Sequence, residues 1–408
     1  MLRTLMHVFL IILVASSAYS MTMEEAVRYG LSQNPELTAS RLEEDVIKGQ
    51  LEKARLPLIF NPTIEGGVEK KGKPPEGGKE FTDYQIRLSQ EFEIAGQRGL
   101  RINIAEKNLS RILLEIRDKE RTLTYDIKEA FARALASKKK EELTKEVVKL
   151  QEELLGFTRI KFQAGDVSAL QVNLAEVEMS KAKRDLLEAG REYREALLTL
   201  QGTMGIKPDP LYSVEGEISA DTLFLPDKER LKNFVALQRP DLKAVSIEVD
   251  ATKTAIDLAK KEAVPNVTLA GHYGKDEKRN EVGLTISIPI PFFDRKQAER
   301  KEAIARAEQA RVKRTGLERT IEREFEETYS NLRSSLDQLS LYKKEIVSKT
   351  QENLSLLNLA FKEEKISFFD VRVAQRETVE IQFSYVDAIL KARRAIHAME
   401  RTIGGGLK

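Results

Sequence analysis

The sequence has no cysteine and no tryptophan, and only three of its 408 residues are histidines. Without cysteine the chain forms no disulfide, holds no thiolate-bound metal and offers no thiol to a lipid anchor. His272 and His397 lie far apart in the sequence, and His7 lies near its start. No phosphate-binding loop or nucleophile elbow is present either. The sequence therefore predicts neither an enzyme nor a protein with a cofactor or a bound metal.

Proline and aromatic residues are also scarce. There are 12 prolines, and aromatic residues make up 6% of the chain, whereas 32% of its residues are charged. This composition favours long helices over compact sandwiches. The 67 Lys and Arg residues nearly balance the 65 Asp and Glu residues, and the two signs are interspersed along the chain. A nucleic-acid partner is therefore not expected.

The one long apolar run lies at the N-terminus. Arg3 precedes an apolar stretch over residues 8–14, and small residues follow at Ser16, Ala18 and Ser20. This pattern indicates a secretory signal peptide over residues 1–20, because the run is shorter than the ~20 residues that a membrane-spanning helix needs. The alternative is an uncleaved anchor. No later segment is apolar enough for a spanning helix, so a place in a membrane would require a barrel.

The two halves of the chain repeat one pattern. The segment Asn61-Pro62-Thr63-Ile64-Glu65-Gly66 returns 205 residues later as Asn266-Val267-Thr268-Leu269-Ala270-Gly271, and residues 162–168 resemble 361–367. We expect one repeat over residues 21–205, a linker over 206–226, a second repeat over 227–404 and a short tail over 405–408, with flexible glycines at 404–406. Two copies are too few for a solenoid. The duplication therefore suggests a pseudo-symmetric protomer that contributes two similar parts to a ring.

Each repeat contains two segments in which apolar and polar residues alternate, the pattern of a strand with one apolar and one polar face. The predicted strands cover about residues 62–70, 83–92, 266–274 and 281–291. About ten residues is also the length of a tilted membrane-spanning strand. A half-buried sheet in a water-soluble protein has the same pattern and remains an alternative. If the strands span a membrane, the residues that face lipid are Ile64, Val68, Ile86, Leu88, Leu269, Leu284, Ile286 and Ile288.

Long segments without proline connect the strands. Residues 97–162 and 295–362 each predict a helix of about 100 Å at ~1.5 Å rise per residue, too long for a globular core. Shorter helices are predicted beside them, and their apolar residues keep the spacing of coiled coils. These shorter helices cover residues 36–56, 168–202, 241–263 and 367–402. Turns before Ser168 and Ser367, the expected N-caps, close the helical hairpins at the end opposite the strands.

The signal peptide, the duplicated pattern of strands and helices and the junction Leu88-Ser89-Gln90-Glu91-Phe92-Glu93-Ile94-Ala95-Gly96-Gln97-Arg98, with its counterpart over 286–295, resemble the TolC-type outer-membrane efflux proteins. The Gly-Gln-Arg of the first junction is most similar to the heavy-metal, CzcC/CusC-like branch. The resemblance implies a mainly α fold with a transmembrane β-barrel portion. In it, duplicated helix-strand-strand-helix-helix units build a long α-helical barrel continuous with a trimeric 12-stranded barrel, to which each protomer gives four strands.

The resemblance also implies partners and sites. We expect a homotrimer in outer-membrane lipid, with a large periplasmic extension that meets a periplasmic adaptor protein and an inner-membrane pump. The turns that would dock the adaptor contain Phe162, Gly165, Asp166, Ser168, Phe361, Glu364, Lys365 and Ser367. Asp370 matches an acidic residue that narrows the aperture in relatives, or else is an ordinary solvated helix residue, and its counterpart in the first repeat is Gln171. Glu364 departs from the glycine usual at such a turn, and relatives that carry an N-terminal lipid differ from this chain, which lacks the cysteine.

The expected function is passive conduction, out of the cell, of substrates expelled by the pump, with heavy-metal cations as the favoured cargo. Two alternatives stay open. The same channel could export organic compounds or proteins, because the sequence does not fix the cargo. A soluble periplasmic coiled-coil adaptor or scaffold would explain the export signal and the heptads, although it leaves the four alternating strands without a role.

Overall fold

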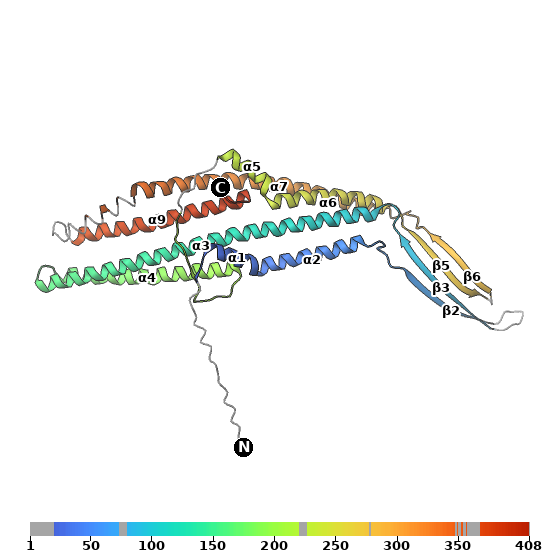
Figure 1. The fold of residues 1–408 in the computed structure, drawn as a ribbon, viewed down its shortest axis with the longest axis horizontal. Coiled ribbons are helices and arrows are strands. Elements are labelled where there is room, and N and C mark those ends of the chain that lie inside the picture. The colour runs from blue at the N-terminus through green and yellow to red at the C-terminus, as the bar shows by residue number, and fades with distance from the viewer. Residues whose placement is uncertain are drawn as a thin grey trace, which may run out of the picture. The chain divides into compact units, whose positions relative to one another are not determined.

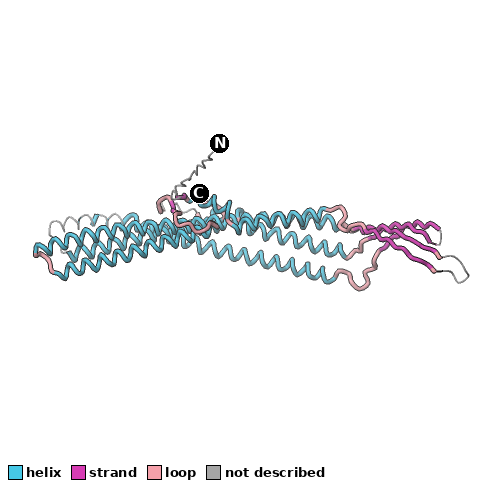
Figure 2. Tube along the Cα trace, turned by 90° about the horizontal axis from the view of Figure 1, so that it is seen from below, coloured by secondary structure: helices cyan, strands magenta, loops and turns pink. Residues whose placement is uncertain are grey.

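The computed structural model describes residues 20–72, 80–219, 227–276, 279–346, 349, 352–353, 356 and 368–407. Helices and a small number of strands make up this part of the chain (Figures 1 and 2). It divides into two compact units, and each takes segments from both sequence repeats. The strand unit consists of residues 39–119 and 236–323. The helical unit consists of residues 1–38, 120–235 and 324–408, so far as these are described.

The strand unit holds a four-stranded antiparallel sheet. Its strands are β2 (Thr63–Lys71), β3 (Phe81–Phe92), β5 (Val267–Asp276) and β6 (Arg279–Ser287), and they pair in the order β2-β3-β5-β6 (Figure 1). All four predicted segments form strands. The largest difference is at β6, which ends at Ser287 instead of residue 291, because Pro289 and Pro291 have no N–H to offer to a neighbouring strand. Ile288, predicted to face lipid from a strand, therefore lies just past the end of β6.

Helices flank the sheet in the sequence. In the first repeat α2 (Pro35–Arg55) precedes β2, and α3 (Gln97–Ala164) follows β3. These two helices pack through Leu51, Ala54 and Ala105. In the second repeat α6 (Pro240–Glu262) precedes β5, and α7 (Gln297–Leu341) follows β6. The Lys107 ammonium donates to the Asp250 carbonyl at 3.1 Å and to the Thr254 hydroxyl at 2.8 Å, which ties α3 to α6.

The first repeat supplies the main core of the helical unit. Here α1 (Met23–Gln33) begins at the capping box of Thr22 and Glu25, and α4 (Ala169–Met204) returns along the second part of α3. Two short strands, β1 (Ser20–Met21) and β4 (Ser213–Val214), pair in parallel beside them. The core includes Met21, Ile127, Phe131, Leu200, Met204 and Val214, all almost fully buried. Gly205 ends α4 with a φ of 78°, and a side chain there would meet the Pro35 ring at 2.5 Å.

The second repeat supplies the other helices of this unit. Helix α5 (Lys228–Gln238) belongs to the helical unit up to Val235, and its last three residues belong to the strand unit. The end of α7 packs against α9 (Phe368–Ile403) through Leu339, Ile389 and Ala392. The sequence predicts one helix through residue 362, whereas the α-helical geometry ends at Leu341 and a π-helical turn (Tyr342–Ile346) follows. Among the described residues, no helix combines the length and the apolar character that a membrane crossing requires.

The glycines after α9 form hydrogen bonds with that helix, and the flexibility expected of them stays a prediction. Gly404 has a φ of 80°, the left-handed conformation that commonly ends a helix. The N–H groups of Gly404 and Gly405 donate to the Glu400 carbonyl at 3.0 and 3.2 Å. The Leu407 N–H donates to the Glu400 carboxylate at 3.4 Å, so the chain turns back onto α9.

Candidate functional site

One face of the sheet consists of exposed apolar side chains. Directly paired residues of neighbouring strands point to the same face, and the register aligns most of the apolar residues with one another, although Gln90 and Lys275 also lie on this face. Ten such residues form what we call the apolar face: Ile64, Val68, Tyr84, Ile86, Leu88, Leu269, Tyr273, Val282, Leu284 and Ile286. Val282 and Leu284 are 80% and 82% exposed. Because burying one large apolar side chain contributes about 1.5 to 3 kcal/mol, this face in water would forgo on the order of 10 kcal/mol.

The opposite face of the sheet is polar. Its side chains include Thr63, Glu65, Gln85, Arg87, Ser89, His272, Glu281 and Thr285. Glu65, Arg87, His272 and Gly283 lie in one cross-strand row. The His272 ring lies over Gly283, where an added Cβ would come within 2.2 Å of the imidazole Cε1. The sheet thus separates an apolar surface from a charged and hydrogen-bonding one.

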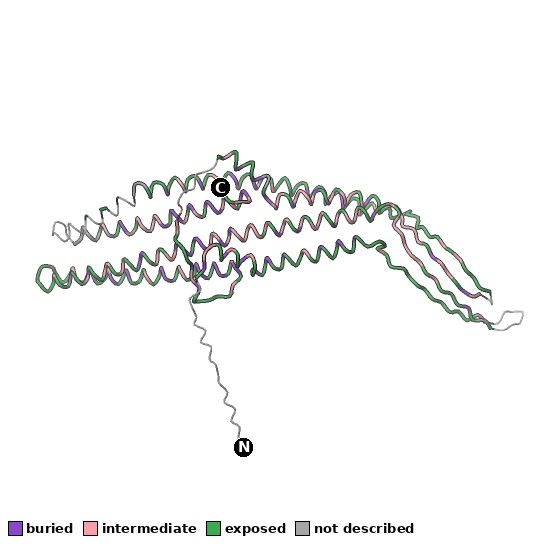
Figure 3. The backbone as a smooth tube through the Cα atoms, in the orientation of Figure 1, coloured by how far each residue is buried: buried purple, intermediate pink, exposed green. Residues whose placement is uncertain are grey.

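Both edges of this sheet are open. Within the described residues, β2 pairs only with β3, and β6 pairs only with β5. The two edge strands are exposed along nearly their whole length, whereas β3 and β5 carry most of the covered positions (Figure 3). An open edge presents unpaired N–H and C=O groups that invite another strand.

The two strand-to-helix junctions have the same backbone turn before the helix. Gly96 and Lys296, two hundred residues apart, both adopt positive φ angles, of 80° and 58°. The next residue in each copy is a glutamine whose Oε1 accepts a hydrogen bond from the N–H two residues before it. These bonds run from Ala95 to Gln97 at 2.9 Å and from Arg295 to Gln297 at 2.7 Å. The recurrence of glutamine at equivalent positions of the two junctions is the signal in the sequence for this shared turn.

The junctions differ in their side chains. In the first, Glu93 binds Arg101 through both carboxylate oxygens, one of them at 3.0 Å from Nη2, and Gln97 is 2% exposed. In the second, the positions of Glu91 and Glu93 are taken by Pro291 and Phe293, and Gln297 is exposed. A surface hollow of about 720 Å³ near these residues is lined by both junctions and by the loop before β5.

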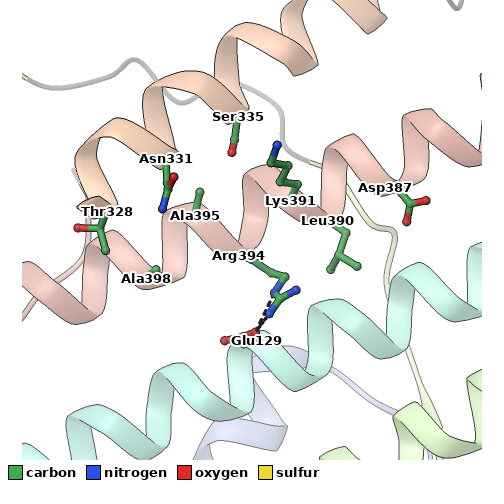
Figure 4. Close-up of a pocket in the computed structure, with 10 residues that line it drawn as sticks. All are labelled: Glu129, Thr328, Asn331, Ser335, Asp387, Leu390, Lys391, Arg394, Ala395 and Ala398. Atoms are coloured by element: carbon green, nitrogen blue, oxygen red, sulfur yellow. Dashed lines mark hydrogen bonds and ion pairs between the residues drawn. The ribbon is translucent and has the colours of Figure 1, made fainter. Parts of the chain in front are cut away.

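In the helical unit, a second hollow of about 500 Å³ lies between α3, α7 and α9 (Figure 4). Its charged side chains already have partners. Arg394 binds Glu129 at 2.7 Å, Asp387 accepts from Lys140 at 2.6 Å, and Lys391 donates to Gln338 at 3.0 Å. The hollow therefore has no unpaired charge with which to hold an ionic ligand, and we interpret it as a packing groove.

A buried ionisable cluster joins α3 to α9 in the same unit. The Glu400 carboxylate accepts from the Lys128 ammonium at 3.1 Å and lies 3.5 Å from Nδ1 of His397. Burial alone would raise the pKa of Glu400, but the contacts with His397 and Lys128 lower it overall. Burial raises the pKa of nearby Tyr125 to about 12. Glu400 also accepts a hydrogen bond from the Leu407 N–H at 3.4 Å, so we interpret the cluster as structural.

The first predicted helical turn is present between α3 and α4. Gly165 has a φ of 86°, and the Asp166 N–H donates to the Lys161 carbonyl at 2.9 Å, which closes the end of α3. The Ser168 N–H donates to the Gln171 side chain at 3.0 Å, as in a capping box. Phe162 beside this turn is 46% exposed.

The second predicted turn cannot be compared with the first. Phe361, Glu364, Lys365 and Ser367 lie outside the described residues. Asp370 lies in the first turn of α9, where the backbone but not the side chain is described.

Comparisons with known proteins agree with this architecture. The cobalt-zinc-cadmium resistance protein CzcC of Cupriavidus metallidurans is 22% identical over 394 residues, which cover 95% of this chain and 91% of that protein. Solved structures of the outer-membrane channel OprN and of CusC match with TM-scores of 0.77 and 0.74 at 17% identity. Each match covers 94% of this chain, and 90% and 92% of those chains, respectively. They show the same fold.

The model of one protein family, outer membrane efflux protein, matches residues 28–206 and 234–405. The two matched segments overlap the two repeats that the sequence predicts, over residues 21–205 and 227–404. This chain therefore belongs to the outer membrane efflux protein family.

Proposed function

We propose that this protein is the outer-membrane channel of a tripartite efflux system and that three copies pool their sheets into one twelve-stranded barrel. The sheet of the strand unit is the observation that carries the proposal. Its apolar face suits lipid and its polar face suits a water-filled passage. The pattern is the reverse of a soluble sheet, in which apolar residues lie under helices or a second sheet.

The open edges of the sheet support assembly. Lipid offers no hydrogen bonds to unpaired backbone groups, so a sheet in a bilayer must close on itself. Four strands are too few, because known single-chain barrels begin at about eight. Pairing of β6 in one copy with β2 in the next satisfies both edges, and the family resemblance selects three copies.

The cargo that we propose is heavy-metal cations, which an inner-membrane pump delivers through a periplasmic adaptor. The match with a cobalt-zinc-cadmium resistance protein supports this choice. Conduction is passive, because the energy comes from the pump. Export begins with the signal peptide at residues 1–20, and without cysteine the protein is not anchored by an N-terminal thioether-linked lipid.

The helical turns are the proposed contact with the adaptor. Phe162 and the turn residues Gly165, Asp166 and Ser168 belong to this surface in the first repeat, and Phe361, Glu364, Lys365 and Ser367 belong to it in the second. We assign Asp370 to the aperture that these helices surround, so that replacement with asparagine should alter cation block of the channel without changing assembly.

Two measurements test the function. The protein purified from outer membranes should run as a trimer and, in a planar bilayer, should give stable ion conductance. Cells that lack their own channel but carry a matching pump and adaptor should regain metal resistance when they express it. A monomer that stays in the aqueous fraction, or a trimer that conducts no ions, would contradict the proposal. Restored export of organic compounds without metal resistance would keep the channel and refute the cargo.

A further inference from the structure

The second junction carries the most exposed large apolar side chains among the described residues. We call residues 288–293, with the sequence Ile-Pro-Ile-Pro-Phe-Phe, the apolar junction. Ile290 is 86% exposed, Phe292 70% and Phe293 88%. Side chains of this size that stay uncovered at one place usually mark a contact surface.

The backbone of the apolar junction is held in one conformation. The Phe292 N–H donates to the Ile290 carbonyl at 2.8 Å, and the Gln297 side chain donates to the Phe293 carbonyl at 3.2 Å. The rings of Phe292 and Phe293 contact each other edge to face, with 5.0 Å between their centroids. The two rings are therefore presented together on a fixed turn, and their exposure does not depend on a loose loop.

The apolar junction continues the apolar face. Val282, Leu284 and Ile286 of β6 are followed at the same two-residue spacing by Ile288 and Ile290. Charged residues come directly afterwards, and Lys296 binds Asp294 at 3.5 Å and Glu299 at 2.8 Å. A change from aliphatic to aromatic to charged residues within a few positions is the order found where a barrel leaves the hydrocarbon and enters the headgroups.

A second copy of the chain fits the apolar junction less well. A neighbouring strand that extended its pairing beyond Ser287 would need N–H groups from the junction, and Pro289 and Pro291 have none. The same two prolines keep the segment out of the sheet of its own chain. Lipid requires no hydrogen bonds from the surface that it covers.

We infer that the apolar junction is an interfacial anchor, which inserts Phe292 and Phe293 among lipids at the boundary between hydrocarbon and headgroups. The equivalent stretch of the first repeat, residues 88–93, has no such role, because it is part of β3 or bound to Arg101. The inference rests on the proposed function, since it places the apolar face in a membrane.

The absence of tryptophan from the chain permits a direct test. Three single-tryptophan proteins would be reconstituted in vesicles of phosphatidylcholine with brominated acyl chains, because bromine quenches only tryptophans that it contacts. Phe293→Trp reports on the apolar junction, and Leu284→Trp reports on the apolar face. Phe162→Trp, the same chemical change at an exposed residue of the helical turn, is the control that lipid should not reach.

We expect Phe293→Trp to lose most of its emission with bromines near the ester end of the chains and less with bromines near the methyl end. Leu284→Trp should be quenched by both lipids, and Phe162→Trp by neither. If Leu284→Trp is quenched and Phe293→Trp is not, the anchor is refuted while the channel stands. The anchor is equally refuted if the Phe293→Trp emission is blue-shifted in the trimer but insensitive to bromine, because a second copy then covers the ring. If no position is quenched, the proposed function fails as well.

Discussion

The two strand-to-helix junctions have the same backbone turn and opposite surfaces. At equivalent positions the first has Ser89, Glu91 and Glu93, and the second has Pro289, Pro291 and Phe293. The first continues as strand to Phe92 and ends in an ion pair, whereas the second leaves the sheet at Ser287 and exposes aromatic rings. The backbone turn that starts the following helix is the same in both.

The place of each strand in the sheet explains the difference. β3 lies between β2 and β5, and its residue Ser89 is paired with Thr63 on one side and Ala270 on the other. An interior strand uses its backbone N–H groups, so proline is excluded there. β6 is an edge strand in the chain and tolerates two prolines just past its end. Position in the sheet therefore accounts for proline being present in the second junction and absent from the first.

The largest effect on stability is expected from exchanging serine and proline between the interior strand β3 and the segment after the edge strand β6. Ser89→Pro removes an N–H from the interior strand and clashes with its neighbours, and we expect it to lower the free energy of unfolding by about 3 kcal/mol or more. The reverse change at the equivalent position, Pro289→Ser, should leave stability within about 0.5 kcal/mol. Guanidinium unfolding in detergent, followed by circular dichroism, measures both. Equal effects of the two changes would show that position in the sheet does not distinguish the junctions.

Breaking the ion pair of the first junction should have the next largest effect. Arg101→Met leaves the Glu93 carboxylate, whose side chain is 17% exposed, without its bidentate partner. Hydrogen bonds to a charged group contribute about 1.5 to 3 kcal/mol, so we expect a loss of about 2 kcal/mol. The matched control is Lys301→Met at the equivalent, exposed position of the second junction, which should have almost no effect. A double change of Glu93 and Arg101 to Gln and Met should recover part of the loss if unpaired charge is its cause.

Gln97 and Gln297 make the same hydrogen bond, one at a buried and one at an exposed site, so replacing each of them tests how burial affects the contribution of that bond to stability. Gln97→Ala removes a buried side chain and leaves the Ala95 N–H without its acceptor, so a loss of about 1 to 2 kcal/mol is expected. Gln297→Ala removes the same bond at an exposed site, where water replaces the acceptor, and should reduce stability by no more than about 0.5 kcal/mol. Similar losses at the two sites would mean that burial does not set the strength of this bond.

The junctions also show which parts of the fold can be predicted from the sequence. Alternation of apolar and polar residues located all four strands, and the turn at Gly165 and the N-cap at Ser168 were predicted correctly. The order of the strands was not predicted, because pairing depends on contacts between segments two hundred residues apart. Without that order Pro289 and Pro291 cannot be recognised as marks of an edge, and alternation alone predicts a strand that continues to residue 291. The hydrogen bonds of Gly404 and Gly405 are local, because their acceptor is the Glu400 carbonyl at the end of the preceding helix, and a run of glycines does not by itself indicate them.

The positive φ angles of Gly96 and Lys296 predict effects of different size for a pair of substitutions. Gly96→Ala adds a Cβ with no neighbour within 4 Å, so the left-handed backbone alone should lower stability, by about 1 kcal/mol. Lys296→Gly relieves that conformation but gives the unfolded chain more freedom and removes two exposed ion pairs, so a change of less than about 0.5 kcal/mol is expected. Lys296→Asn, which favours the same backbone region, is the control for strain.

The smallest expected difference between the junctions is in how their contribution to stability changes at low pH. The Lys296 N–H, which donates to the Asp294 carboxylate at 2.9 Å, lowers the pKa of Asp294 below its usual value, and no bond of this kind is described in the first junction, where Ile94 takes its place. A carboxyl group whose pKa is lowered by folding stabilises the folded state above its unfolded pKa, and this contribution is lost as the pH falls through the folded value. Asp294→Asn should therefore reduce stability slightly at neutral pH and not at all at a pH well below the folded value. A loss that is independent of pH would show that the Asp294 side chain acts through packing, and the acid sensitivity of the second junction would then have another source.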